Sequence, residues 1–198
     1  MVQQKQSVSL VLASSSPYRR QLLQRLGLDF QSCSPAINES RKEGETAEDL
    51  VARLALEKAR CMANEYPGAV IIGSDQVAIL ADEILTKPED HYRAVAQLEK
   101  LSGREVCFLT GVCVLNAKSG REQSGVVSCY VSFRMLEGEE IERYLRAEKP
   151  YDCAGSFKSE GLGISLLRSM RCDDPTSLIG LPLIRLAGML RKEGFSVP

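Results

Sequence analysis

Two hydrophobic patterns alternate along the chain. Short apolar runs rich in β-branched residues predict strands, and apolar residues spaced three and four apart predict helices. We predict strands at 8–13, 69–72, 77–80, 106–115 and 126–133, and helices at 17–26, 46–65, 90–101, 137–147 and 177–193. This alternation is typical of an α/β fold.

The chain of 198 residues is 44% hydrophobic, which is enough to form a sizeable core. Gly and Pro mark turns, as at Pro67-Gly68 and Ser102-Gly103, but no linker rich in Ser or Pro and no repeat divides the sequence. We therefore expect a single domain over 1–198, with a poorly ordered segment at 1–8, and leave open whether it is divided into two lobes.

A helix start follows the first apolar run. Ser16 suits the N-cap and Pro17 suits the first helical position, so Arg19 and Arg20 lie in the first turn. There they oppose the helix dipole, which favours anions by about 0.3–1 kcal/mol. Either an anion such as a phosphate joins the arginines, or they form a solvated pair on an ordinary surface helix.

Lys58 interrupts the apolar side of the next predicted helix. At 100° per residue it falls in the middle of the stripe formed by Val51, Leu54, Ala55, Cys61 and Met62. Two interpretations stay open: its ammonium reaches water from the edge of the stripe, or it points into a cleft that holds an anion.

Two acidic residues are candidates for chemistry. Asp75 follows the run Ala69–Ile72, so we expect it at the carboxyl end of a buried strand, where α/β sheets bind ligands. The alternative is a turn aspartate satisfied by backbone N–H groups. Glu39 lies in a polar loop after a predicted second strand. It is either solvated or pairs with Asp75 at a magnesium ion that also holds substrate phosphates.

Composition narrows the class of partner. The chain has 25 basic and 26 acidic residues and a net charge of −1, so we expect a small-molecule substrate and no nucleic-acid polymer. The only histidine, His91, is expected at the surface near a helix start, which leaves no simple route to a His-based metal site or a Ser-His-Asp triad.

The spacing of the cysteines and the polarity of the N-terminal residues indicate the cellular compartment of the protein. Seven widely spaced cysteines without a CxxC pair predict reduced, mostly buried thiols in a reducing compartment. Residues 1–9 are polar, and the apolar run after them is too short for a signal peptide or a membrane span. We expect a cytoplasmic protein without a membrane partner.

The motifs LASSSPYRRQLL, the loop with Glu39, LALEKA, IIGSDQV, TKP, AGSFKSEG and SLIGLPL follow one another along the chain. In this order they resemble the Maf family of nucleotide pyrophosphatases over roughly residues 8–193. The resemblance implies an elongated mixed β-sheet flanked by helices, with two lobes around a deep cleft. Because the family is often dimeric, a homodimer is a further expectation.

The resemblance also implies a reaction, the hydrolysis of a nucleoside triphosphate between its α and β phosphates with Mg²⁺ or Mn²⁺ as cofactor. It assigns phosphate contacts to Ser14, Arg19, Lys58 and Lys87, and an acidic, metal-binding pair to Glu39 and Asp75. Asp75 is the implied catalytic proton acceptor. A carboxylate bound directly to metal is a poor base, so the sequence leaves open whether Asp75 contacts the ion directly or through the attacking water.

Tyr18, Gln76 and Glu160 occupy the positions at which Maf subgroups differ. They resemble the subgroup that hydrolyses 7-methyl-GTP, whereas the dTTP/UTP subgroup tends to carry Arg, Thr and Gln there. An aromatic ring attracts the cationic methylated guanine by about 0.5–2 kcal/mol, and a carboxylate accepts from its N1–H and amine. Tyr18 replaces the stronger partner Trp, and the role of Gln76 stays open.

We therefore predict a house-cleaning hydrolase that removes 7-methyl-GTP. Two alternatives are kept: a pyrophosphatase that prefers dTTP and UTP, and a nucleotide-binding regulator of cell division without turnover. The retention of Glu39, Asp75, Lys58 and Lys87 argues against a regulator, because mere binding needs no positioned water.

Overall fold

The computed structural model describes residues 9–198 and contains a mixed seven-stranded sheet. The strand order is β2-β1-β3-β5-β6-β7, and β4 pairs with β3. Its strands are β1 (Leu10–Ala13), β2 (Gln31–Cys33), β3 (Val70–Leu80), β4 (Glu83–Leu85), β5 (Glu105–Asn116), β6 (Arg121–Phe133) and β7 (Leu167–Cys172). The prediction of a poorly ordered segment at 1–8 concerns residues that lie outside the described part of the chain.

Five α-helices and three short 3-10 helices flank the sheet. The α-helices are α1 (Pro17–Gln24), α2 (Ala47–Cys61), α3 (His91–Leu101), α4 (Gly138–Glu148) and α5 (Leu183–Lys192). The 3-10 helices are η1 (Ala154–Ser156), η2 (Leu162–Leu166) and η3 (Pro175–Ile179). These elements confirm the α/β fold class.

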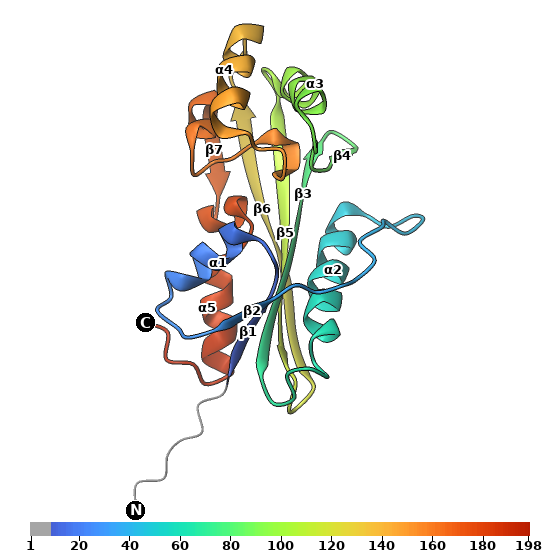
Figure 1. The fold of residues 1–198 in the computed structure, drawn as a ribbon, viewed down its shortest axis with the longest axis vertical. Coiled ribbons are helices and arrows are strands. Elements are labelled where there is room, and N and C mark those ends of the chain that lie inside the picture. Colours follow the sequence, from blue (N-terminus) through green and yellow to red (C-terminus); the bar gives the residue numbers. More distant parts are fainter. Residues whose placement is uncertain (1–8) are drawn as a thin grey trace, which may run out of the picture.

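The long antiparallel strands β3, β5 and β6 run through the whole length of the molecule (Figure 1). Near one end they are flanked by β1, β2, α1, α2 and α5, and near the other by β4, β7, α3 and α4. Within residues 9–198, the only parallel strand pairs are β1 with β2 and β1 with β3. The result is the elongated, two-lobed shape that the sequence predicts.

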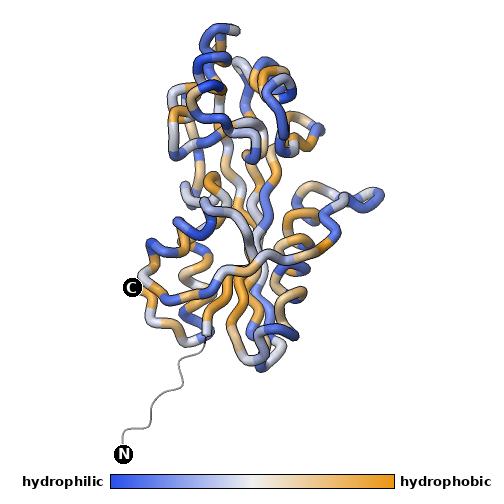
Figure 2. The backbone as a smooth tube through the Cα atoms, in the orientation of Figure 1, coloured by the Kyte–Doolittle hydropathy of each residue, from blue (hydrophilic) through white to orange (hydrophobic). Residues whose placement is uncertain are grey.

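Successive side chains of β1 pack on opposite faces of the sheet. Leu10 and Leu12 pack in the cluster that includes α1 and α5, whereas Val11 and Ala13 pack with α2 on the opposite face. Figure 2 shows hydrophobic residues concentrated along these strands and hydrophilic ones on the outer turns and helices. A separate cluster around Phe108, Phe133 and Leu145 forms the core of the other lobe.

Helix α2 lies in direct backbone contact with the sheet. A Cβ atom at Gly73 would collide with the carbonyl oxygen of Ala55, and one at Gly111 with that of Val51. Since no side chain fits between helix and sheet at these points, α2 approaches β3 closely enough for Lys58 to reach Asp75. The helix starts as predicted, with Thr46 as N-cap.

The prediction of separate strands at 69–72 and 77–80 is wrong, because β3 continues through both. Asp75 is therefore in the middle of a strand, paired with Gly111, and not at its carboxyl end. On the other edge of β3, pairing with β1 ends at Gly73 and pairing with β4 begins at Ala78. Asp75 lies in the gap between those two strands.

Two other element predictions need correction. The helix predicted over 177–193 is divided into η3 and α5, since Gly180 adopts a φ of 117° and Pro182 precedes the first turn of α5. Strand β7 was not predicted, because most of its residues are exposed and show no alternating apolar pattern. No helix within 9–198 is long and apolar enough to cross a membrane.

The expectation of seven reduced, mostly buried thiols is wrong in part. Cys129 and Cys172 lie opposite each other in β6 and β7, with Cα atoms 4.5 Å apart, and form a disulfide. The other five cysteines are free, and of these Cys113 is buried and Cys61 exposed. Cys61 is therefore not part of the buried apolar stripe predicted for this helix, although the next residue, Met62, is buried.

Candidate active site

A cleft of about 1360 Å³ contains every residue that the sequence places in the site. Its lining includes Ser14, Tyr18, Arg19, Glu39, Lys58, Asp75, Gln76, Lys87 and Glu160. These residues come from segments spread from β1 to the loop after η1, so the fold brings distant motifs together. Of the two arginines in the first turn of α1, Arg19 lines the cleft, whereas Arg20 is exposed and does not line it.

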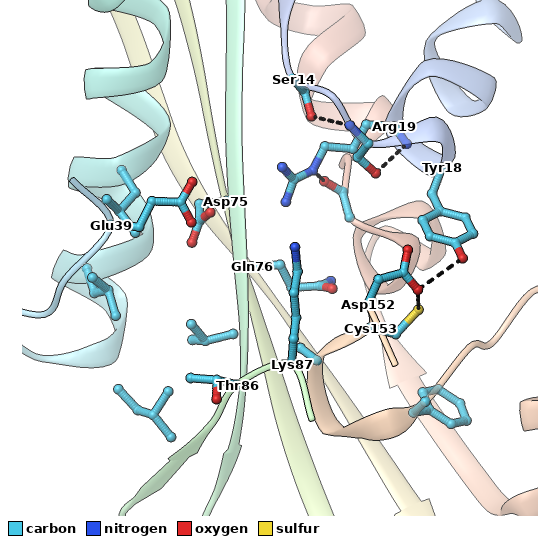
Figure 3. Close-up of a pocket in the computed structure, with 18 of the residues that line it drawn as sticks. Ser14, Tyr18, Arg19, Glu39, Asp75, Gln76, Thr86, Lys87, Asp152 and Cys153 are labelled. Atoms are coloured by element: carbon cyan, nitrogen blue, oxygen red, sulfur yellow. Dashed lines mark hydrogen bonds between the residues drawn. The ribbon is translucent and has the colours of Figure 1, made fainter. Parts of the chain in front are cut away.

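The start of α1 forms one wall. Ser16 is the N-cap, its hydroxyl accepting from the Arg19 backbone at 3.4 Å, and Ser14 Oγ accepts from the Ser16 backbone at 3.1 Å. Arg19 Nε donates to the carbonyl oxygen of Gly180 at 2.8 Å, and its guanidinium extends into the cleft (Figure 3). Burial lowers the pKa of Arg19, while Asp75 and Glu39 oppose that effect.

Lys58 lies between the two acidic residues. Its Nζ donates to Asp75 Oδ1 at 2.6 Å and lies 2.8 Å from Glu39 Oε1. Only 6% of Lys58 is exposed, so the ammonium does not escape to water; it points into the cleft. Burial acts to raise the pKa of Glu39, but Lys58, Lys87 and Arg19 outweigh it and lower that pKa.

The acidic pair meets a geometric requirement for a shared cation. Because Glu39 Oε1 and Asp75 Oδ1 lie 2.8 and 2.6 Å from the same nitrogen, these oxygens are at most 5.4 Å apart, the sum of the two distances. Residues 9–198 hold no cluster of three or more His, Cys, Asp or Glu side chains arranged for a metal. Within these residues, Glu39 and Asp75 are therefore a pair and not part of a larger cluster of such side chains.

Gln76 and Tyr18 line the cleft away from this pair. The Gln76 amide nitrogen donates to the Ser177 carbonyl at 2.7 Å and to Thr110 Oγ1 at 2.9 Å, so its orientation is fixed. Figure 3 shows Tyr18 across the cleft from Glu39 and Asp75, with Lys87 and the Arg19 guanidinium between them. Glu160 is exposed at the lining.

Sequence reasoning missed several residues that shape the cleft. Gly180 and Ser177 lie in the quoted SLIGLPL motif, yet only the structure links their carbonyls to Arg19 and Gln76. Asp152 and Lys158 contact Tyr18, the latter with its Nζ 5.7 Å from the ring centre. They follow α4, far from Tyr18 in sequence. Lys158 lies in the quoted AGSFKSEG motif, but only the structure links it to Tyr18, and no local pattern marks Asp152.

Most of the chain matches a known protein family. Residues 9–193 match the family model described as Maf-like protein. The chain belongs to this Maf-like family.

Curated relatives of this Maf-like chain are similar over nearly their whole length. A protein of Pseudomonas savastanoi pv. phaseolicola named 7-methyl-GTP pyrophosphatase is 60% identical over 190 residues, which cover 96% of this chain and 99% of the relative. One of the same name from Pseudomonas aeruginosa is 56% identical, covering 96% and 98%.

Solved structures resemble the Maf-like chain more distantly. A nucleoside-triphosphatase / dITP/XTP pyrophosphatase from Mycobacterium abscessus aligns with 94% of this chain and 95% of its own. The two are 17% identical, with a TM-score of 0.46. The Ham1 protein of Staphylococcus aureus aligns with 63% of this chain and 71% of its own, at 14% identity and a TM-score of 0.45.

Proposed function

We propose that this chain is a nucleoside triphosphate pyrophosphatase that hydrolyses 7-methyl-GTP to 7-methyl-GMP and pyrophosphate, a house-cleaning activity against modified nucleotides. One observation carries the proposal: a single cleft combines the cations Arg19, Lys58 and Lys87 with the aromatic ring of Tyr18 and the carboxylate of Glu160. The names of the close relatives support the same substrate.

The cationic groups match a triphosphate. Arg19 and Lys87 extend toward the middle of the cleft, where phosphate oxygens would receive charge-assisted hydrogen bonds (Figure 3). Ser14, at the start of α1, adds a hydroxyl beside a helix N-terminus, which favours anions. Catalysis of phosphoryl transfer depends mainly on such positioning and neutralisation of charge.

Glu39 and Asp75 fit a divalent cation, and we assign the Mg²⁺ or Mn²⁺ site to them. Magnesium is usually held by one or two carboxylates together with substrate phosphates, and these two carboxylates already share a cation, Lys58. When bound, the ion would neutralise phosphate charge and polarise the bond to be cleaved.

Asp75 also suits the role of proton acceptor. Lys58 contacts Oδ1 of Asp75, and no donor within the described residues contacts its Oδ2. In our proposal Oδ2 is not bound directly to the ion and takes the proton of the attacking water, while the hydrogen bond from Lys58 fixes the orientation of the carboxylate.

Tyr18, Glu160 and Gln76 provide base recognition in this account. The Tyr18 ring would stack on the positively charged 7-methylguanine, whose N1–H and amine would donate to Glu160. The fixed amide of Gln76 leaves its oxygen as the group available to the nucleotide.

A nucleotide panel tests the proposal. Pyrophosphate release is measured with Mg²⁺ or Mn²⁺ and 7-methyl-GTP, GTP, dTTP or UTP. We expect 7-methyl-GTP to have the highest kcat/KM. We expect Asp75→Asn to lower the kcat for 7-methyl-GTP by at least about 100-fold, the usual scale for losing a general base.

The control Asp29→Asn alters an exposed aspartate outside the cleft. A preference for dTTP or UTP, or full activity of Asp75→Asn, contradicts the proposal.

A further inference from the structure

Asp152 lies beside Tyr18 although 134 positions separate them in sequence. Its Oδ1 accepts a long hydrogen bond of 3.4 Å from the Tyr18 hydroxyl and a contact of 3.6 Å from the Cys153 thiol. Figure 3 shows these three side chains together on the wall of the cleft opposite Glu39 and Asp75. Asp152 is therefore part of the surface next to Tyr18.

Asp152 forms no salt bridge with any residue of the described part of the chain. No Lys, Arg or His nitrogen in the described range lies within 4.0 Å of Asp152 or of Glu160, which lines the same cleft. The neighbouring Cys153 thiol stays neutral, because burial, aided by Asp152, raises its pKa to about 12. Lys158, whose pKa is raised chiefly by its hydrogen bond to Glu148 and to a smaller extent by the charge of Glu160, forms its salt bridge with Glu148 at 3.2 Å. This part of the cleft thus holds two carboxylates without a salt bridge of their own.

The Tyr18 ring already faces a positive group. Lys158 Nζ is 5.7 Å from the ring centre, within the range of a cation–π contact. Burial foremost, and after it Cys153, Asp152 and Glu160, raise the pKa of the Tyr18 hydroxyl, so all these groups act on the same ring. The Tyr18 ring and the adjacent carboxylate of Asp152 are thus two groups that interact favourably with positive charge.

We propose that Asp152 is a further specificity-determining residue, whose carboxylate favours a nucleobase with a delocalised positive charge over the neutral form of the same base. The inference rests on the proposed function. Glu160 accepts hydrogen bonds from an edge that guanine and 7-methylguanine share, so this hydrogen-bond pattern does not separate the two bases. A charge beside the stacked ring does, because only the methylated base is cationic.

The substitution Asp152→Asn tests this assignment. Asparagine keeps an oxygen that accepts from Tyr18, removes the charge and replaces the second carboxylate oxygen by an NH₂ group of similar size. We expect kcat/KM for 7-methyl-GTP to fall about tenfold, mainly through KM, and that for GTP to change less than about twofold. Asp152→Glu should retain most of the preference. The control Asp173→Asn makes the same change at an exposed aspartate outside the cleft.

Salt distinguishes a charge effect from a structural one. Raising the ionic strength from about 50 to about 500 mM should reduce the preference for 7-methyl-GTP over GTP more strongly in the wild type than in Asp152→Asn, which keeps only the carboxylate of Glu160 here. An unchanged preference in Asp152→Asn, or equal losses with both substrates, would overturn the assignment. Failure of the wild type to hydrolyse 7-methyl-GTP would instead reject the proposed function.

Discussion

At the scale of single residues, Lys58 connects the chemistry to the stability of the site. Its ammonium contacts both acidic residues, yet the two contacts differ in exposure. The side chain of Glu39 is 57% exposed, whereas that of Asp75 is 11% exposed. Breaking a buried ion pair by removing one partner is costly, because the other charge stays buried.

Replacing Lys58 by Met should therefore destabilise the protein. We expect the free energy of unfolding to fall by about 3–5 kcal/mol, since Asp75 would lose its buried partner. Urea unfolding followed by circular dichroism measures the change. The control Lys100→Met breaks an exposed pair with Glu83 and should cost at most about 1 kcal/mol. Equal losses in the two variants would show that burial of the Lys58–Asp75 pair contributes little.

The sequence identified single residues well where a local rule was violated. Lys58 on an apolar stripe and Arg19 in a first turn both contradict helix patterning, and both line the cleft. Asp152 breaks no such rule, since an exposed aspartate after a helix is ordinary. Its importance depends on its closeness to Tyr18, which the tertiary fold alone creates.

At the scale of elements, the loop that carries Glu39 is attached to α2. Arg53 Nε donates to Glu45 Oε1 at 2.6 Å, and its Nη2 donates to Glu45 Oε2 at 2.9 Å and to the Ser40 carbonyl at 3.1 Å. The hydrogen bond from Arg53 and one from the Lys42 backbone lower the pKa of Glu45 from 4.5 to about 2. These contacts fix the loop beside Lys58.

This attachment predicts a specific acid sensitivity. Because folding lowers the pKa of Glu45, its stabilising contribution is complete above pH 4.5 and is lost as the pH falls toward about 2. Glu45→Gln should therefore show a shallower loss of stability than wild type across this interval, measured as thermal midpoint against pH. Glu43→Gln, in the same loop, serves as the control. Identical slopes for Glu45→Gln and wild type would refute the role of the pair.

Helices and strands could be predicted from the sequence where the local pattern of capping and apolar residues agrees with the burial of those residues in the fold. The start of α1 followed from Ser16 and Pro17, and that of α2 from Thr46. The strand break expected at Gly73–Gln76 does not exist, because distant partners satisfy the polar side chains inside β3. Ser74 Oγ donates to the carbonyls of Gly111 and Gly180, and Asp75 pairs with Lys58. No local window of sequence contains those partners.

At the scale of the whole molecule, the cleft is assembled from both lobes. Arg19, Lys58 and Glu39 come from segments around α1 and α2, whereas Lys87, Asp152 and Glu160 come from segments near α3 and α4. A nucleotide that contacts both groups would join the two lobes. The resemblance implied this cleft, but hydrophobic periodicity alone did not, since the long pairings of β3 and β5 are non-local. The single domain, the homodimer and the cytoplasmic location stay predictions.

Identifying which phosphate bond of 7-methyl-GTP is cleaved tests the central claim most directly. We would follow 7-methyl-GTP by ³¹P NMR during incubation with the wild-type protein and Mg²⁺. The account predicts 7-methyl-GMP and pyrophosphate in equal amounts, with no orthophosphate, because the triphosphate is cut between its α and β phosphates. Orthophosphate with 7-methyl-GDP, or binding of 7-methyl-GTP without any product, would contradict it.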